Sequence, residues 1–149
     1  VETDALSGLL LVLSAFVSVQ VLLAIVASYR GWIYSRRHDG SSLQLALNDG
    51  QIALAIRFFG HVIGVALAVT AASGIVAYFT EEIALALLRW VGVALILTIF
   101  LSLIASLARK LVLLGVDVVE EVDNQNNVGV AAIEAAIAIA VGLFFVALF

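Results

Sequence analysis

Four long apolar stretches limit what this chain can fold into. Each is long enough to cross a hydrocarbon core of about 30 Å, which takes about 20 residues of α-helix. Of the 149 residues, 64% are hydrophobic and 12% are charged, whereas soluble domains are roughly half apolar and a quarter charged. We therefore predict an all-α integral membrane four-helix bundle that forms one domain over residues 1–149. The expected spans are residues 5–29, 51–78, 83–108 and 128–149.

The basic residues predict how the chain crosses the membrane. Five of the seven lie in the first and third connections, namely Arg30, Arg36, Arg37, Arg109 and Lys110. The N-terminus and the second connection carry none. Because cytoplasmic connections are enriched in Lys and Arg, we expect connections 30–47 and 109–127 to be cytoplasmic, with both termini outside.

The chain also shows signs of an internal duplication. Sliding the sequence so that Arg57 meets Glu134 also aligns the polar turns 48–50 and 125–127. Each half is then a long span, a cytoplasmic connection and a second span. We expect two parallel two-span repeats, one over about residues 1–78 and one over about 79–149, rather than inverted repeats. The expected N-caps of the second span in each half are Asn48, Asp49, Asn126 and Asn127.

Two opposite charges lie at matching depths, Arg57 in the second span and Glu134 in the fourth. An unpaired charge in hydrocarbon costs about 2.5–3.5 kcal/mol, so we expect these two to pair. His61 lies one turn from Arg57 on the same helix face. One interpretation is an ion pair that fixes how the repeats pack. The other is an intramembrane polar site, responsive to protons or ions, formed by Arg57, His61 and Glu134.

Small and weakly polar residues predict contacts between helices. Gly60 and Gly64 lie on the Arg57 face, where missing side chains let two backbones approach. Thr98 and Ser102 belong to a ridge of small and hydroxyl-bearing residues on the third span. We expect these four residues to pack helices together, and the alternative for the ridge is a path for a solute.

Two further features concern contacts outside the bundle. Arg89 lies about 10 Å from the outer end of its span, and it either reaches the lipid headgroups or meets an acceptor on a neighbouring subunit. Connection 109–127 is either a solvated extension packed on its neighbour or a docking surface for a cytoplasmic partner. Apolar residues recur there at helical spacing, at Leu111, Leu114, Val118 and Val122.

Signatures of soluble enzymes are absent from the sequence. There is no phosphate-binding glycine loop, zinc-protease motif or nucleophile elbow. The chain has no cysteine, and neither of its histidines, His38 and His61, has a carboxylate at metal-ligand spacing. We therefore expect no enzymatic activity, no cofactor, no metal and no nucleic-acid partner.

The segments NDGQIALAI, residues 48–56, and NNVGVAAIE, residues 126–134, follow the cytoplasmic connections of the two halves. With these motifs the chain resembles the YjfL-like family, small bacterial inner-membrane proteins of tandem two-helix repeats with unknown function. The resemblance implies a bacterial inner membrane and envelope-stress partners, and it brings no catalytic residues. Arg57, where the second half has Glu134, departs from the more uniform repeats of that family.

These observations favour a non-enzymatic subunit of a homo- or hetero-oligomeric inner-membrane assembly. Such a subunit contacts the lipid bilayer and either itself or another membrane protein. The alternative is an ion, proton or small-solute channel or transporter that uses Arg57, His61 and Glu134.

Overall fold

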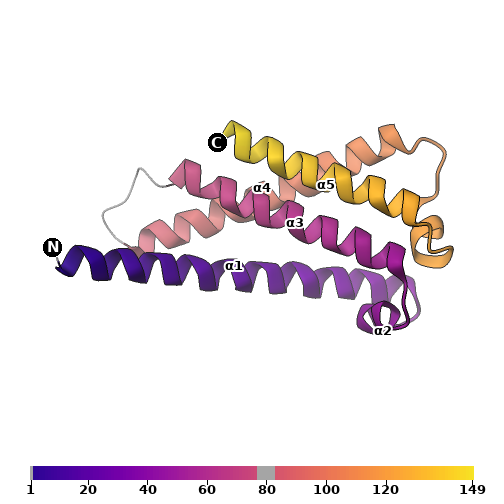
Figure 1. The fold of residues 1–149 in the computed structure, drawn as a ribbon, viewed down its shortest axis with the longest axis horizontal. Helices are drawn as coiled ribbons and strands as arrows, with labels where there is room; N and C mark the ends of the chain where they lie inside the picture. Colours follow the sequence, from indigo (N-terminus) through magenta and orange to yellow (C-terminus); the bar gives the residue numbers. More distant parts are fainter. Residues whose placement is uncertain (1, 77–82) are drawn as a thin grey trace.

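The computed structural model describes residues 2–76 and 83–149, and it is helical through most of that range. The long helices are α1, Glu2–Arg37; α3, Ile52–Val76; α4, Ile83–Val112; and α5, Val128–Leu148. Two short elements lie in the connections: α2, Leu43–Asn48, and the π-helical turn η1, Glu120–Asn124. Figure 1 shows the long helices running side by side, with both chain ends at one end of the bundle. We call the opposite end, which holds α2 and η1, the basic end.

Four of the helices are long and apolar enough to cross a membrane, which indicates a membrane protein. The prediction of an all-helical chain with four such helices is confirmed for the described residues. Two helices continue past the predicted spans, because α1 runs to Arg37 and α4 to Val112. Basic residues in the last turns of both helices favour this continuation, since they complement the partial negative charge of a helix C-terminus. Residues 77–78 of the second predicted span lie outside the described residues.

Helices α3 and α5 form the most extensive helix pair. A Cβ added to Gly64 would lie 2.7 Å from the carbonyl oxygen of Ala138, and Gly60 packs even more tightly against Ala135. On the other helix, a Cβ added to Gly142 would lie 2.9 Å from the carbonyl oxygen of Gly64. Glycine and alanine therefore bring the two backbones into direct contact, which increases dispersion attraction between them. Both glycines expected to pack helices lie on this seam.

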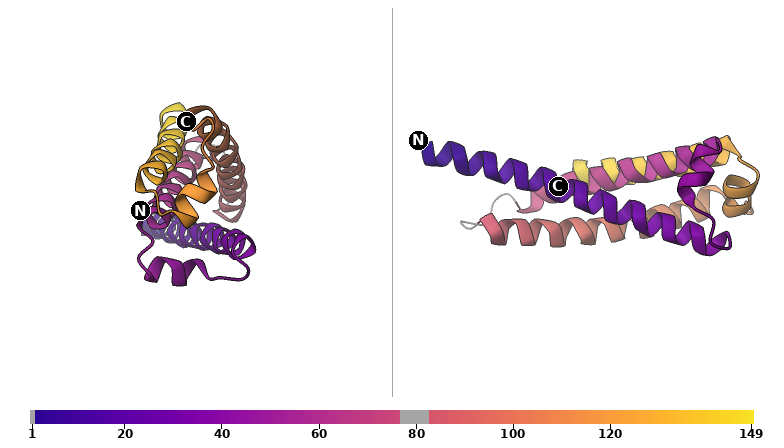
Figure 2. Two further views of the ribbon diagram at one scale, coloured as in Figure 1. Left: turned by 90° about the vertical axis from the view of Figure 1, so that its right-hand side faces the viewer. Right: turned by 90° about the horizontal axis from the view of Figure 1, so that it is seen from below.

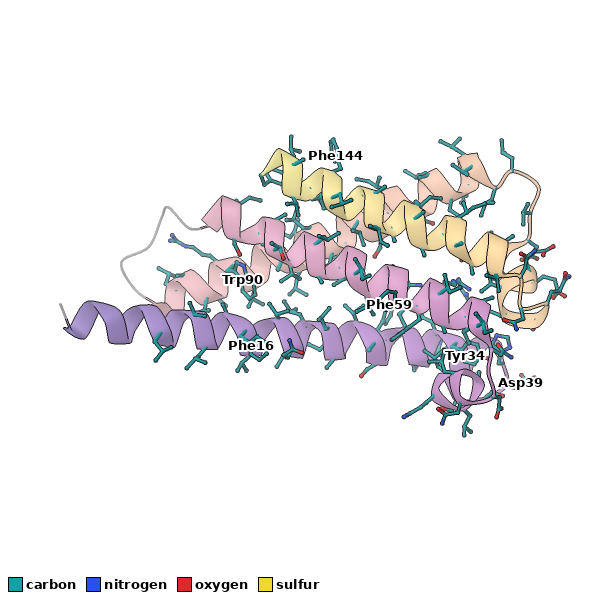
Figure 3. The ribbon with its side chains drawn as sticks, in the orientation of Figure 1. Phe16, Tyr34, Asp39, Phe59, Trp90 and Phe144 are labelled. Atoms are coloured by element: carbon teal, nitrogen blue, oxygen red, sulfur yellow. The ribbon has the colours of Figure 1, made fainter. Side chains whose placement is uncertain are left out.

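An apolar core fills the half of the bundle nearer the chain termini. The buried side chains come mainly from α3 and α4, with contributions from α1 and α5: Leu22, Val65, Val69, Trp90, Leu97, Leu101 and Phe145. The indole Nε1 of Trp90 (labelled in Figure 3) donates a hydrogen bond to Ser73 Oγ at 3.1 Å, which ties α4 to α3. This half of the bundle is therefore closed by packed hydrocarbon side chains.

Helix α1 contacts the other helices less than they contact one another. Of its described side chains, only Leu22 and Tyr34 are buried. Figure 2 shows the N-terminal part of α1 extending past the other helices. Exposed side chains in that part include Leu9, Val12, Leu13, Phe16 and Val17.

The N-cap prediction is right for Asn127, whose Oδ1 accepts hydrogen bonds from two backbone amides of α5 at 3.1 and 3.2 Å. Asn126 caps the N-terminus of α3 instead. Its Oδ1 accepts a hydrogen bond from the backbone N of Ala53 at 2.8 Å. The prediction is wrong for Asn48 and Asp49. These two residues end α2, so they precede the start of α3 by too many residues to cap it.

Candidate functional site

Charged side chains of α3, α4, α5 and the connections meet at the basic end. Arg57 Nε lies 3.0 Å from Glu134 Oε2, and Arg57 Nη1 donates to Asp123 Oδ1 at 2.7 Å. Arg109 Nη1 donates to Glu134 Oε1 at 2.9 Å, and His38 Nε2 lies 3.3 Å from Asp123 Oδ2. The two charges expected to pair are therefore in contact. They belong to a larger group, which we call the ion network: His38, Arg57, Arg109, Asp123 and Glu134.

The centre of the ion network is buried. The exposed fraction is 12% for the side chain of Arg57, 2% for Asp123 and 9% for Glu134. Glu134 Oε2 is in ionic contact with Arg57 but accepts no hydrogen bond from the described residues. Removing one partner from a buried ion pair costs about 3–5 kcal/mol, because the remaining charge stays desolvated. Each member of this network is therefore held by the others.

Helix geometry explains why the charges meet. Arg57 lies five residues after the start of α3, and Glu134 lies six residues after the start of α5. At about 1.5 Å per residue both side chains start about 8–9 Å from the basic end. Arg109 reaches the same level from the last turn of α4. The tight contact between α3 and α5 then brings Arg57 and Glu134 together.

His61 contacts Arg30 of α1. Arg30 Nη2 lies 2.7 Å from Nδ1 and 2.6 Å from Nε2 of the imidazole. A neutral imidazole has one acceptor nitrogen, so it receives a hydrogen bond from the guanidinium without neutralising it. Within the described chain, no carboxylate lies at ion-pair distance from Arg30. The expected grouping of His61 with Arg57 and Glu134 holds only in that all three line one cavity.

That cavity has a volume of about 520 Å³ and is lined by side chains of α1, α3, α4 and α5. Such a volume suits a small-molecule ligand or part of a larger one. Its ionisable lining side chains include Arg30, Arg37, Arg57, His61, Arg109 and Glu134. We call it the arginine cavity. Among the described residues, no cluster of three His, Asp or Glu side chains could hold a metal ion.

The hydroxyl groups of Thr98 and Ser102 do not bridge helices. Thr98 Oγ1 donates to the carbonyl oxygen of Ala94 at 2.8 Å, and Ser102 Oγ donates to that of Thr98 at 3.0 Å. Both bonds lie within α4, as is common for hydroxyl residues inside a helix. Both residues line the arginine cavity. The expected role of Thr98 and Ser102 in packing helices together stays a prediction.

The remaining predicted positions lie on the surface or in the connections. Arg89 is exposed on α4. Connection 109–127 is only partly helical, because α4 ends at Val112 and η1 begins at Glu120. Val118 and Val122 are buried in a small cluster with Ala53 and Ala131, whereas Leu111 and Leu114 are exposed. Packing on neighbouring helices is thus observed for half of this apolar set.

Sequence reasoning missed the roles of Arg30, Arg109 and Asp123. The two arginines were expected in cytoplasmic connections because each follows a long apolar run. No role was assigned to Asp123 from the sequence, although it follows Val122, which belongs to the predicted apolar face. If the predicted helices had included Arg30 and Arg109, several arginines would have faced the single carboxylate of Glu134. That excess of positive charge would have indicated a second buried carboxylate.

Comparison with protein-family models matches residues 4–149 to a family described as Domain of Unknown Function (DUF350). The match includes the arginine cavity and the whole ion network. Neither the curated proteins nor the solved structures gave a match to this chain.

Proposed function

Because the chain belongs to this family, whose function is unknown, we propose a function from the geometry: a non-enzymatic subunit of an oligomeric membrane assembly. We place it in the bacterial inner membrane, with the basic end and connections 30–47 and 109–127 in the cytoplasm. The positive charge of Arg36, Arg37 and Lys110 at that end supports this orientation.

The proposal includes the YjfL-like assignment and the parallel repeat. Each half has a long helix, a short element and a second long helix, in the orders α1–α2–α3 and α4–η1–α5. The same order of elements supports two repeats that run in the same direction. The YjfL-like resemblance adds partners of the bacterial envelope to the proposal.

The observation that supports an assembly is one face of α1 that is lined by exposed small and polar residues. Gln20, Ala24 and Ser28 are exposed, and the position of a Cβ on Gly31 meets open space. Their spacing places these four residues along one side of the helix. Exposed small residues with a polar side chain among them are typical of contacts between membrane helices, where each hydrogen bond contributes about 0.6 kcal/mol. We assign this face to a contact with the same face of a second copy.

Cysteine crosslinking tests this contact, because the chain has no cysteine of its own. The Ala24→Cys variant should form a disulfide-linked dimer on mild oxidation in membranes. The matched control is Ile25→Cys, the next residue, which is also exposed but points about 100° away. We expect a yield lower by about a factor of ten in the control, since a disulfide needs Cα atoms within about 7 Å. Equal yields, or monomer from both variants, would exclude the proposed interface.

Two surface features support further contacts. The exposed Leu111 and Leu114 fit the docking of a cytoplasmic partner at connection 109–127. Arg89, exposed on α4, is placed to contact lipid headgroups or a neighbouring subunit. These contacts extend the proposed assembly and are not required for the α1 interface.

A pathway for an ion, a proton or a small solute is the second candidate function. It is favoured by the arginine cavity, whose lining includes Arg57, His61 and Glu134. Beyond the cavity, however, the apolar core fills the bundle with side chains such as Leu101 and Phe145. We therefore prefer the assembly, in which the charged residues hold the helices in place.

A further inference from the structure

The arginine cavity carries more positive than negative charge. Four guanidinium groups meet two carboxylates, Glu134 on the cavity wall and Asp123 behind Arg57, so two positive charges are not balanced. Arg30 is the clearest case, because its partner His61 offers only a nitrogen acceptor. A charge without a counter-ion beside hydrocarbon is costly, so this geometry calls for an anion.

We propose that the arginine cavity binds the phosphate headgroup of an anionic phospholipid from the leaflet at the basic end. Arg30, Arg57 and Arg109 approach the cavity from three different helices. Guanidinium groups bind phosphate oxygens through paired, charge-assisted hydrogen bonds. Basic pockets between membrane helices are known to hold the headgroups of anionic lipids.

The mouth of the cavity favours a lipid over a free phosphate ion. Tyr29 on α1 and Ile99 and Leu103 on α4 line the cavity and are 57%, 60% and 57% exposed. Side chains that both line a cavity and reach the surface mark its opening, so the cavity opens sideways between α1 and α4. Acyl chains leaving through this opening would run along apolar side chains. A free phosphate ion would gain nothing from such a rim.

The depth of the arginines also fits a headgroup. Arg30 lies seven residues before the end of α1, and Arg57 lies five residues after the start of α3. At about 1.5 Å per residue, both lie within about 10 Å of the basic end. The polar headgroup region extends roughly 5–7 Å beyond each side of the hydrocarbon core. With the basic end at the outer edge of the headgroups, the arginine backbones lie about 3–5 Å below the headgroup region, a depth from which a long side chain reaches the phosphates.

Lipid binding to the purified full-length protein tests the proposal without any substitution. Native mass spectrometry in a neutral detergent, with phosphatidylglycerol or phosphatidylcholine added, gives the affinity for each lipid. We expect phosphatidylglycerol to bind at least about tenfold more tightly, which corresponds to one charge-assisted contact of about 1.4 kcal/mol. Equal affinity for the two lipids would overturn the proposal.

The Arg30→Gln variant tests the site. It should weaken phosphatidylglycerol binding about tenfold, because it removes the cation that has no carboxylate partner. The matched control is Arg36→Gln, on the same helix but outside the cavity, where Arg36 stacks over Trp32 at 4.2 Å. Both variants must elute from gel filtration as the wild type does. Equal losses in the two variants, or no loss in either, would overturn the site.

A substitution at the opening of the arginine cavity tests whether the bound phosphate belongs to a lipid or is a free ion. Leu103→Trp should lower phosphatidylglycerol binding about fivefold by obstructing the acyl chains, while millimolar inorganic phosphate should hardly displace the lipid. Unchanged lipid binding by Leu103→Trp, together with full displacement by inorganic phosphate, would assign the cavity to a soluble anion and overturn the lipid. The proposal does not depend on the oligomer, so crosslinking of α1 cannot decide it.

Discussion

The Arg57 guanidinium contacts two carboxylates at once, and each of these has a second basic partner. Asp123 also contacts His38, and Glu134 also accepts a hydrogen bond from Arg109. Arg57 and Glu134 are therefore not an isolated pair. Each of these two charges also contacts an oppositely charged side chain from another element. Reversing the sign of either charge therefore affects more than one contact.

A charge swap tests this arrangement. We expect the double variant Arg57→Glu with Glu134→Arg to be no more stable than either single variant, each losing about 3–5 kcal/mol. The Glu134→Arg substitution brings a second guanidinium against Arg109, and Arg57→Glu brings a second carboxylate against Asp123. Unfolding in mixed detergent micelles measures the free energies, with the exposed Lys110→Gln as control. A double variant that regains most of the loss would show that the pair acts alone.

Among the elements, α3 and α5 form the rigid unit of the bundle, because their glycines and alanines leave no side chain between the backbones. This contact also fixes the positions of Arg57 and Glu134. Helix α1 contributes to the arginine cavity but packs lightly, so its own surface remains open to lipid or to another copy. The positions of the small residues thus explain both the close packing of α3 with α5 and the open surface of α1.

Alanine substitutions separate packing from helix propensity. Gly64→Ala should lower the free energy of unfolding by about 1–3 kcal/mol, because the new Cβ meets the carbonyl oxygen of Ala138 and the backbones must separate. Gly92→Ala, on α4, adds a Cβ into open space and should stabilise the protein by about 0.5–1 kcal/mol. The same micelle unfolding measurement applies. Changes of equal sign in both variants would contradict the α3–α5 contact.

The molecule as a whole is hollow at the basic end and closed toward the chain termini. The arginine cavity lies toward the basic end, and the apolar core with Leu97, Leu101 and Phe145 lies toward the chain termini. Water entering at the basic end therefore meets packed hydrocarbon before it could reach the other side. This asymmetry agrees with a binding or assembly role better than with conduction.

Proton flux into proteoliposomes tests the asymmetry. Under an imposed pH gradient, we expect the wild type and Glu134→Gln to give the same flux as protein-free liposomes, because the apolar core offers no hydrogen-bonded path. A pH-sensitive dye inside the vesicles measures the flux. Flux in the wild type that Glu134→Gln abolishes, and that Lys110→Gln leaves unchanged, would establish the transport function instead.

The features that could be predicted from the sequence depend only on position along the chain. The four long helices follow from the length of apolar runs, because each run is desolvated independently of the others. The contact of Arg57 with Glu134 follows from opposite signs at equal depth. The contacts of Arg30 with His61 and of Arg57 with Asp123 depend on how α1 and η1 rotate and fold against the bundle. Those rotations are set by packing between elements, which no single stretch of sequence contains.

The hydrogen bond from the backbone of Ala53 to Asn126 has a consequence for biogenesis. A ribosome makes α3 well before it makes Asn126, so the newly inserted first hairpin lacks the acceptor that completes its second helix. That acceptor arrives only when the later hairpin enters the bilayer. The earlier half therefore gains this cap only after the later half has been made.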